Sequence, residues 1–271
     1  MSISTPRVED LRRAATLLAQ TRRDNSVLDH LPAQVAPSDI EESYLVADLL
    51  AQDLGWPIKG WFCGATNVAI QELLGLDGPY HARLFEHLVF ESPATLDPDL
   101  FPPMVIETEV VFTLGESLPP REQPYTQEEV AAAVASVSGS IEVVAGHLYD
   151  WPNQDPFSVI ADNGTDGALI TGPAVTQWRE LDLADITVEV RVNGQVAGSG
   201  QSDSVLGNPL VAMTWLANER SQRGDGLVAG HVHNTGTLTR PIPVAAGDTV
   251  VADFTGLGAV ELTIATEGTP S

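Results

Sequence analysis

The stretch Val105-Ile-Glu-Thr-Glu-Val-Val-Phe-Thr-Leu114 has the alternating, β-branched composition of a single β-strand. Successive side chains of a strand point to opposite faces, so Glu107 and Glu109 share one face and lie about 7 Å apart. Two carboxylates placed in this way repel each other unless solvent or a cation lies between them. A hard divalent cation such as Mg²⁺ or Mn²⁺ binds oxygen ligands of this kind. The stretch therefore predicts a strand that can contribute to a metal site.

A third carboxylate, Glu142, lies in the apolar run Ser140-Ile-Glu-Val-Val144, where a charge needs a physical reason. One interpretation is that Glu142 joins Glu107 and Glu109 around a cation. The other is that all three carboxylates lie on solvated strand faces, because Glu-x-Glu pairs are common in strands. Spacing alone leaves both interpretations open.

The rest of the chain separates into a helical part and a β-rich part. Apolar periodicity predicts helices over residues 8–19 and 39–54, the second capped by Ser38, and further helices over about 126–137 and 209–223. Thr126 and Glu129 form a capping-box pattern at the start of the third helix. Runs rich in Val, Ile and Thr predict strands over 141–148, 186–192, 250–254 and 260–264. We expect an α+β protein with a helical N-terminal region, residues 1–60, and a β-rich catalytic domain, residues 61–271.

Composition excludes several classes of partner. The 271 residues carry 13 basic and 37 acidic side chains, a net charge of −24, which disfavours nucleic acid and anionic membrane surfaces. The chain has no apolar run of the roughly 18 residues that a membrane helix needs and no secretory signal, so we expect a cytoplasmic protein. Cys63 has no second cysteine to pair with. Lys59 is the one side-chain amine available to any reaction that needs it.

Other polar motifs are weaker. The chain has no G-x-S-x-G elbow, no P-loop and no H-E-x-x-H motif. His231 and His233 flank Val232 and would share a strand face, either as a metal or acid–base pair or as ordinary solvent-facing histidines. Thr235 and Gly236 follow them and could present a hydroxyl and a backbone N–H to an anion.

Five segments, taken in order, closely resemble one family: I-E-T-E-V-V-F-T-L, S-I-E-V-V, I-A-D-N, V-L-G-N-P-L-x-A-x-x-W-L-A and A-G-x-V-x-x-T-G-T-L. This is the 2-keto-4-pentenoate hydratase/4-oxalocrotonate decarboxylase family of the fumarylacetoacetase-like superfamily, and the resemblance extends to about residue 264. It implies a fumarylacetoacetase-like mixed β-roll with a smaller helical N-terminal region. It also implies a homo-oligomer.

The resemblance further implies the site and its chemistry. The family's metal ligands match Glu107, Glu109 and Glu142, which would hold Mg²⁺ or Mn²⁺. The implied activity is that of a lyase, a hydratase or decarboxylase, acting on a 2-oxo acid or 2-hydroxydienoate. The cation would stabilise the enolate that forms when a proton moves or CO₂ leaves.

The chain departs from the family pattern around this metal set. The family's G-x-K-x-G is Gly60-Trp-Phe-Cys-Gly64 here, so Phe62 stands at the lysine position. Lys59 is three residues away, and an odd offset points to the opposite strand face unless a bulge intervenes. Tyr80 replaces the aspartate of P-D-x-G. Histidines stand where the family has the Arg of Ser-Arg and the Asp of Gly-Asp, at His147 and His231.

These departures define a diverged pocket. His147, His231 and Tyr80 are the candidates for proton transfer, and Phe62, Thr235 and Gly236 are the candidates for contact with the substrate.

Three functions remain open. The protein is a lyase of the family, or it is a recruited metal-enolate enzyme, an isomerase or cyclase acting on a β-dicarbonyl or larger metabolite, or it is a non-catalytic complex partner. We favour the lyase, because a complex partner has no need of three clustered carboxylates.

Overall fold

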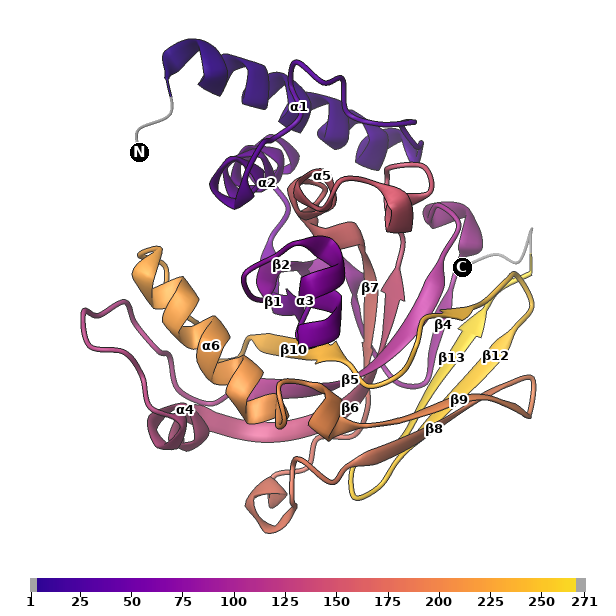
Figure 1. Ribbon diagram of the computed structural model, residues 1–271. Helices are drawn as coiled ribbons and strands as arrows, with labels where there is room; N and C mark the ends of the chain where they lie inside the picture. The colour runs from indigo at the N-terminus through magenta and orange to yellow at the C-terminus, as the bar shows by residue number, and fades with distance from the viewer. Residues whose placement is uncertain (1–3, 267–271) are drawn as a thin grey trace.

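Strand β5 (Val105–Leu114) has the predicted bounds and lies at the middle of an eight-stranded mixed sheet. A computed structural model describes residues 4–266 (Figure 1). The strands of this sheet follow the order β2-β1-β10-β5-β6-β7-β3, and β11 pairs with the start of β5. The pairs β1–β10 and β3–β7 are parallel, whereas β5 is antiparallel to both of its neighbours. The mixed pairing confirms the predicted α+β class.

The first sheet comprises the strands β1 (Ile58–Gly64), β2 (Tyr80–Phe85), β3 (Val89–Glu91), β5, β6 (Val134–Val144), β7 (Asp166–Thr171), β10 (Val232–Thr237) and β11 (Ile242–Pro243). A second sheet, in the order β4-β13-β12-β8-β9, contains β4 (Ala94–Leu96), β13 (Gly258–Ile264), β12 (Thr249–Phe254), β8 (Thr187–Val192) and β9 (Gln195–Gln201). The helices are α1 (Thr5–Asp24), α2 (Ile40–Leu54), α3 (Val68–Leu74), α4 (Gln127–Ala133), α5 (Pro156–Ala161) and α6 (Pro209–Gln222).

The first sheet curls into a roll, because β2 also contacts β7 although several strands separate them in the sheet order. Its outer face packs against the second sheet and helix α6 in the main apolar core, which includes Ile106, Phe112 and Ile141. Its inner face carries a smaller apolar cluster around Phe62 and Leu169. The inner face of the roll also carries the carboxylates described below.

Helices α1 and α2 pack together above the roll (Figure 1). Their buried faces, including Leu11, Leu18 and Leu50, form a separate apolar cluster. Asp39 caps α2, because its side chain accepts a hydrogen bond from the backbone N–H of Glu42. The predicted cap at Ser38 is therefore wrong; Ser38 instead donates to the Glu42 side chain.

Two predicted elements have different bounds. The helix expected over 126–137 begins with the Thr126–Glu129 capping box but ends at Ala133. Residues from Val134 onward extend β6, because pairing with β5 overrides the local helical pattern. The strand expected over 141–148 is the end of β6 and stops at Val144.

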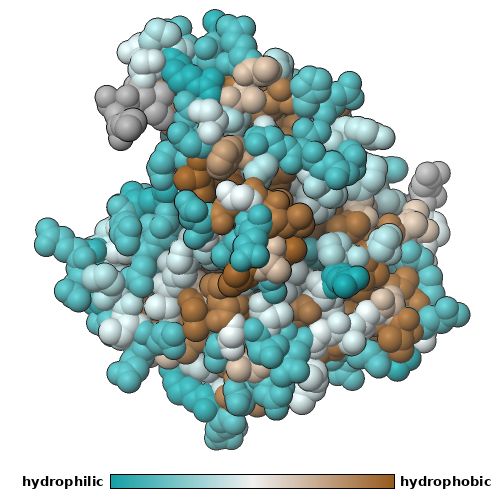
Figure 2. Space-filling view, in the orientation of Figure 1, coloured by the Kyte–Doolittle hydropathy of each residue, from teal (hydrophilic) through white to brown (hydrophobic). Residues whose placement is uncertain are grey.

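The surface is a mixture of polar and apolar side chains (Figure 2). Apolar side chains gather near the centre of the face shown, over the place that α3 occupies in Figure 1. On α3, Val68, Ile70 and Leu73 are exposed. Within residues 4–266, every helix is too short or too polar to cross a membrane.

Replacing the α2 cap should destabilise the fold. We expect Asp39→Ala to lower the free energy of unfolding by about 1 kcal/mol, because the orphan N–H of Glu42 loses its acceptor. Asp39→Asn keeps a capping oxygen and is the matched control. Chemical denaturation measures both, and equal losses for the two variants would contradict the capping role.

Candidate metal centre

The register of β5 and β6 brings the three carboxylates together. Glu107 lies directly opposite Glu142, and Glu109 lies opposite Ser140. Residues that face each other across antiparallel strands project to the same side of the sheet. Glu107, Glu109 and Glu142 therefore all project from the inner face of the roll, where Glu109 and Glu142 are buried.

Hydrogen bonds fix two of the three carboxylates. The backbone N–H of Gly236 donates to Glu109 Oε2 at 2.5 Å, and Asn234 Nδ2 donates to Glu142 Oε2 at 2.5 Å. Ser140 Oγ in turn donates to Asn234 Oδ1 at 2.9 Å, which orients the amide. Glu109 and Glu142 lie close enough for each to influence the pKa of the other.

Burial and mutual repulsion make this group of carboxylates costly to ionise. Burial and the charge of Glu142 raise the pKa of Glu107 to about 8. Burial also raises the pKa of Glu142 to about 7, and burial together with its two neighbours raises the pKa of Glu109 well above its usual range. None of the ion pairs within residues 4–266 includes any of the three. Their negative charge is therefore balanced by protons or by a bound cation.

The donor set fits a hard divalent cation, since carboxylate oxygens are the ligands that Mg²⁺ and Mn²⁺ prefer. In their present rotamers, no three His, Cys, Asp or Glu side chains within residues 4–266 are arranged to hold one ion together. Glu109 and Glu142 instead accept hydrogen bonds from the Gly236 N–H and the Asn234 amide. Glu107, Glu109 and Glu142 would hold such a cation after their side chains change rotamer.

Two aromatic rings lie beside the carboxylates. Phe62 of β1 pairs with Asn234 and so shares the inner face. Tyr80 of β2 packs over Gly64, where a Cβ would lie 2.0 Å from its ring. The three glutamates are among its charged neighbours, and burial together with their charge raises the pKa of the Tyr80 phenol. The phenol is therefore protonated at neutral pH and can donate a proton or a hydrogen bond.

The structure places His147 away from the carboxylates. Its ring Nδ1 lies 3.0 Å from the carbonyl oxygen of Ser26, and its backbone N–H donates to Asp162 Oδ2 at 2.8 Å. Burial and the nearby Arg22 lower the pKa of His147 to about 4, so the imidazole is neutral at pH 7. Its contacts join β6 to the N-terminal helices.

His231 and Thr235 also do not face the carboxylates. The carbonyl of His231 accepts from Leu114 N–H, five residues beyond Glu109 and about 16 Å along the strand. The Thr235 hydroxyl donates to the carbonyl of Val110 at 2.8 Å, so it is not free to bind a substrate anion. Of the predicted Thr235–Gly236 pair, Gly236 alone reaches the site, and its N–H binds Glu109.

Lys59 lies next to a β-bulge, an irregularity that could have turned its side chain toward the carboxylates. The β1–β2 register shifts between Ile58 and Gly60, as in a β-bulge. Lys59 lines a cavity at the other end of the roll, next to Thr113, which lies about 13 Å along β5 from Glu109. The bulge therefore does not bring the amine to the carboxylates.

Sequence reasoning missed Asn234 and Ser140 as parts of the site. Both residues stand inside the motifs that carry the family resemblance. Their role depends on the β5–β6 and β5–β10 registers, which a single sequence does not give.

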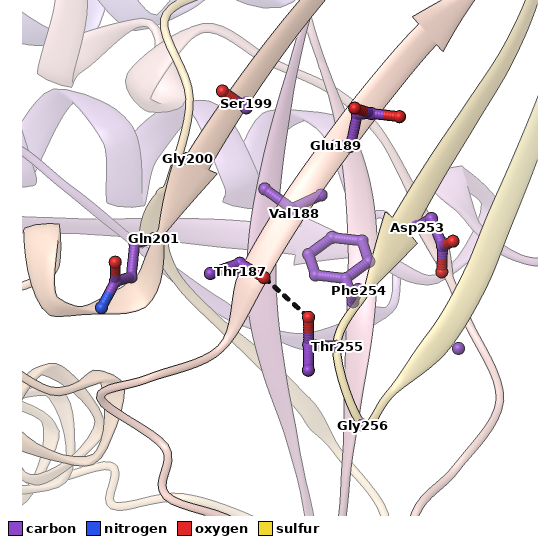
Figure 3. A pocket seen from close by; sticks show the side chains of 11 residues that line it. Thr187, Val188, Glu189, Ser199, Gly200, Gln201, Asp253, Phe254, Thr255 and Gly256 are labelled. Carbon is purple, nitrogen blue, oxygen red and sulfur yellow. Dashed lines mark hydrogen bonds between the residues drawn. The ribbon is translucent and has the colours of Figure 1, made fainter.

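A depression of about 840 Å³ lies on the second sheet (Figure 3). It is lined by residues of β8, β9 and β12, and the hydroxyls of Thr187 and Thr255 approach to 2.6 Å at its edge. Its acidic residues, Glu189 and Asp253, come from exposed strand positions. This depression contains none of the three buried glutamates and is a separate feature.

Comparisons with known proteins all point to one family. Residues 89–265 match the C-terminal domain of the fumarylacetoacetate (FAA) hydrolase family. The chain is 30% identical to a 2-keto-4-pentenoate hydratase of Paraburkholderia xenovorans (strain LB400) over 250 residues, 91% of this chain and 92% of the relative. It is 32% identical to a 2-hydroxyhexa-2,4-dienoate hydratase of Comamonas testosteroni over 212 residues, 77% of this chain and 79% of the relative.

A solved structure with a similar fold is the 4-oxalocrotonate decarboxylase from Pseudomonas putida G7 complexed with magnesium and adipate. The two chains are 25% identical, and the match has a TM-score of 0.87 and covers 97% of this chain and 99% of the decarboxylase. This similarity confirms the predicted fumarylacetoacetase-like β-roll.

The raised pKa values of the glutamates lead us to expect that the free energy of unfolding depends on pH. Because their folded pKa values lie above those of the unfolded chain, stability should fall as the pH rises from about 4.5 to 8. Mg²⁺ at pH 8 should raise the melting temperature. Glu142→Gln removes one charge, so the variant should melt higher than the wild type at pH 8 without metal and respond less to Mg²⁺.

Differential scanning calorimetry over pH 5–9 measures these changes. Glu261→Gln, which replaces an exposed glutamate of β13, is the control and should behave like the wild type. An equal response of both variants to Mg²⁺ would contradict the site.

Proposed function

Since the chain belongs to the fumarylacetoacetate hydrolase family, in the group of 2-keto-4-pentenoate hydratases and 4-oxalocrotonate decarboxylases, we propose that it is a metal-dependent lyase of this group. Its substrate is a 2-oxo acid or a 2-hydroxydienoate. The observation that carries the proposal is the set of three glutamates on the inner face of the roll, with no cationic side chain paired to them within residues 4–266.

Glu107, Glu109 and Glu142 would hold Mg²⁺ or Mn²⁺. When bound, the cation supplies a Lewis acid that stabilises the negative charge developing on the 2-oxygen of the substrate. Asn234 and the Gly236 N–H orient two of the ligands through their hydrogen bonds. Such supporting contacts commonly tune both the geometry and the affinity of a metal site.

Tyr80 is our candidate for proton transfer. Its phenol is protonated at neutral pH, and the three glutamates are among its charged neighbours. A positioned acid of this kind contributes typically 10²–10⁴-fold to a rate. His147 is a weaker candidate, because its ring contacts the Ser26 carbonyl near the N-terminal helices. His231 is also weaker, because it lies near Lys59 at the far end of the strand.

Phe62 favours a substrate with an apolar body. Its ring belongs to the apolar cluster on the inner face, together with Ala82, Leu84, Val111 and Leu169. This buried cluster carries no charge, so it would suit the apolar part of a substrate. The same observation favours a second candidate, a metal-dependent isomerase or cyclase that acts on a larger enolisable carbonyl compound.

We also propose a homo-oligomer, supported by three exposed apolar side chains of α3, those of Val68, Ile70 and Leu73. Size-exclusion chromatography with light scattering tests this proposal. A monomer at all concentrations would contradict it.

The direct test of function is turnover of three compounds: 2-keto-4-pentenoate, 2-hydroxyhexa-2,4-dienoate and 4-oxalocrotonate. Ultraviolet absorbance follows loss of the conjugated substrate with Mg²⁺, with Mn²⁺ and with EDTA. We expect metal-dependent turnover of at least one compound and none in EDTA. Turnover that is insensitive to EDTA would contradict the proposal. Metal binding without turnover of any of the three would favour the isomerase or cyclase.

Tyr80→Phe separates proton transfer from metal binding. We expect kcat to fall at least 100-fold while the affinity for Mg²⁺ stays within about twofold, because the phenol is not a ligand. Tyr125→Phe, which removes a phenol that hydrogen-bonds to Pro119 far from the site, is the control. Steady-state kinetics and calorimetry measure both quantities, and unchanged kcat in Tyr80→Phe would rule out the assigned role.

A further inference from the structure

Arg22 of helix α1 is a buried cation with no obvious structural reason to be buried. Its side chain is 2% exposed, and its Nη2 pairs with Asp162 at 3.0 Å and with Asp166 at 2.7 Å. The same nitrogen donates to the carbonyl oxygen of Asp162 at 2.6 Å. A buried ion cluster of this kind carries a large desolvation cost, so it seldom stabilises a fold by itself. Arg22 also lies outside residues 89–265, which match the family.

The segment that Arg22 holds is strained. Asn163, Gly164 and Thr165 have consecutive φ values of 52°, 65° and 64°, in the left-handed region. That region is costly for a β-branched residue such as Thr165. A strained loop persists only where its surroundings fix it, and such loops are concentrated at functional sites.

The loop is tied to strand β2, which carries Tyr80. Asn163 Oδ1 accepts from the Arg83 N–H at 2.9 Å, and Asn163 Nδ2 donates to the Arg83 carbonyl at 3.0 Å. Gly164 lies against the two aromatic rings of the site, since a Cβ there would lie 2.9 Å from Tyr80 and 3.0 Å from Phe62. A displacement of the loop would therefore move both rings.

The loop is also tied to the strand that carries Glu142. Asp162 Oδ2 accepts from the backbone N–H of His147, and the Thr165 carbonyl accepts from Ala145 N–H at 3.0 Å. Asp166 begins β7, and it lines a small cavity together with Glu142. The loop thus contacts both walls of the carboxylate site.

We propose that Arg22 is a positioning residue of the active site: by holding Asp162 and Asp166, it fixes the 162–166 loop, which sets Tyr80 and the β6–β7 pair around Glu142. The N-terminal helix is then part of the catalytic unit. This inference rests on the proposed function for its effect on metal and turnover, but its structural part stands on the loop contacts alone.

The test compares Arg22→Gln with Arg23→Gln. Arg23 is the next residue of α1, is exposed, and donates to the Asp53 carbonyl of α2, so its loss loosens the helix pair without touching the loop. Hydrogen exchange followed by mass spectrometry measures the amide exchange rates of residues 80–85 and 162–171. Titration calorimetry measures the affinity for Mg²⁺. For Arg22→Gln we expect exchange at least tenfold faster in both segments, and Mg²⁺ affinity 10- to 100-fold weaker. For Arg23→Gln we expect both at the wild-type level.

Arg22→Lys is a second, more conservative variant, which keeps the test informative if Arg22→Gln does not fold. It keeps the charge, but a shorter side chain with a single ammonium does not reach both aspartates as the guanidinium does. We expect it to fold, with faster exchange at 80–85 and an Mg²⁺ affinity between those of the wild type and Arg22→Gln. Wild-type exchange and affinity in Arg22→Lys would overturn the proposal, as would equal effects of Arg22→Gln and Arg23→Gln. If the wild type binds no Mg²⁺, the proposed function fails, and exchange at 80–85 alone decides the role of Arg22.

Discussion

Repulsion among three glutamates inside a β-roll is the constraint on which the rest of the site depends. The β5–β6 register puts Glu107 and Glu142 opposite each other, and Glu109 lies two residues further along β5 on the same face. Charges of one sign in a low-dielectric interior are tolerated only when protons, hydrogen bonds or a cation offset them. The Asn234 amide and the Gly236 N–H supply hydrogen bonds, but neither supplies a charge. A divalent cation would supply the positive charge that these hydrogen bonds lack.

The surroundings follow from that constraint. Tyr80 offers a protonated phenol to a strongly negative region, and Phe62 closes the wall with apolar surface. The nearby buried cation, Arg22, binds two aspartates rather than the glutamates. Its positive charge is therefore used by the 162–166 loop and does not neutralise the three glutamates. Through this contact helix α1 is tied to the 162–166 loop, although the helix lies above the roll (Figure 1).

Local patterns predicted much of this arrangement. Alternation in β5 put Glu107 and Glu109 on one face, and resemblance to a family added Glu142. Contacts that depend on register or docking were not predictable. Asn234 and Ser140 meet only through strand pairing, and Arg22 reaches Asp162 only because helix α1 docks on the 162–166 loop. The proton-transfer roles of two histidines stay predictions that their contacts do not favour. Substitution at family positions pointed to His147 and His231, but their contacts are made with the N-terminal helices and the far end of the roll.

The most direct test is crystallography of the protein soaked with Mn²⁺, with data collected at a wavelength where manganese scatters anomalously. We expect one strong anomalous peak on the inner face of the roll, with Glu107, Glu109 and Glu142 as the protein ligands of the ion. A peak confined to exposed acidic positions, such as Glu189 and Asp253, would contradict the account. So would the absence of any peak at the three glutamates at saturating Mn²⁺ and pH 8.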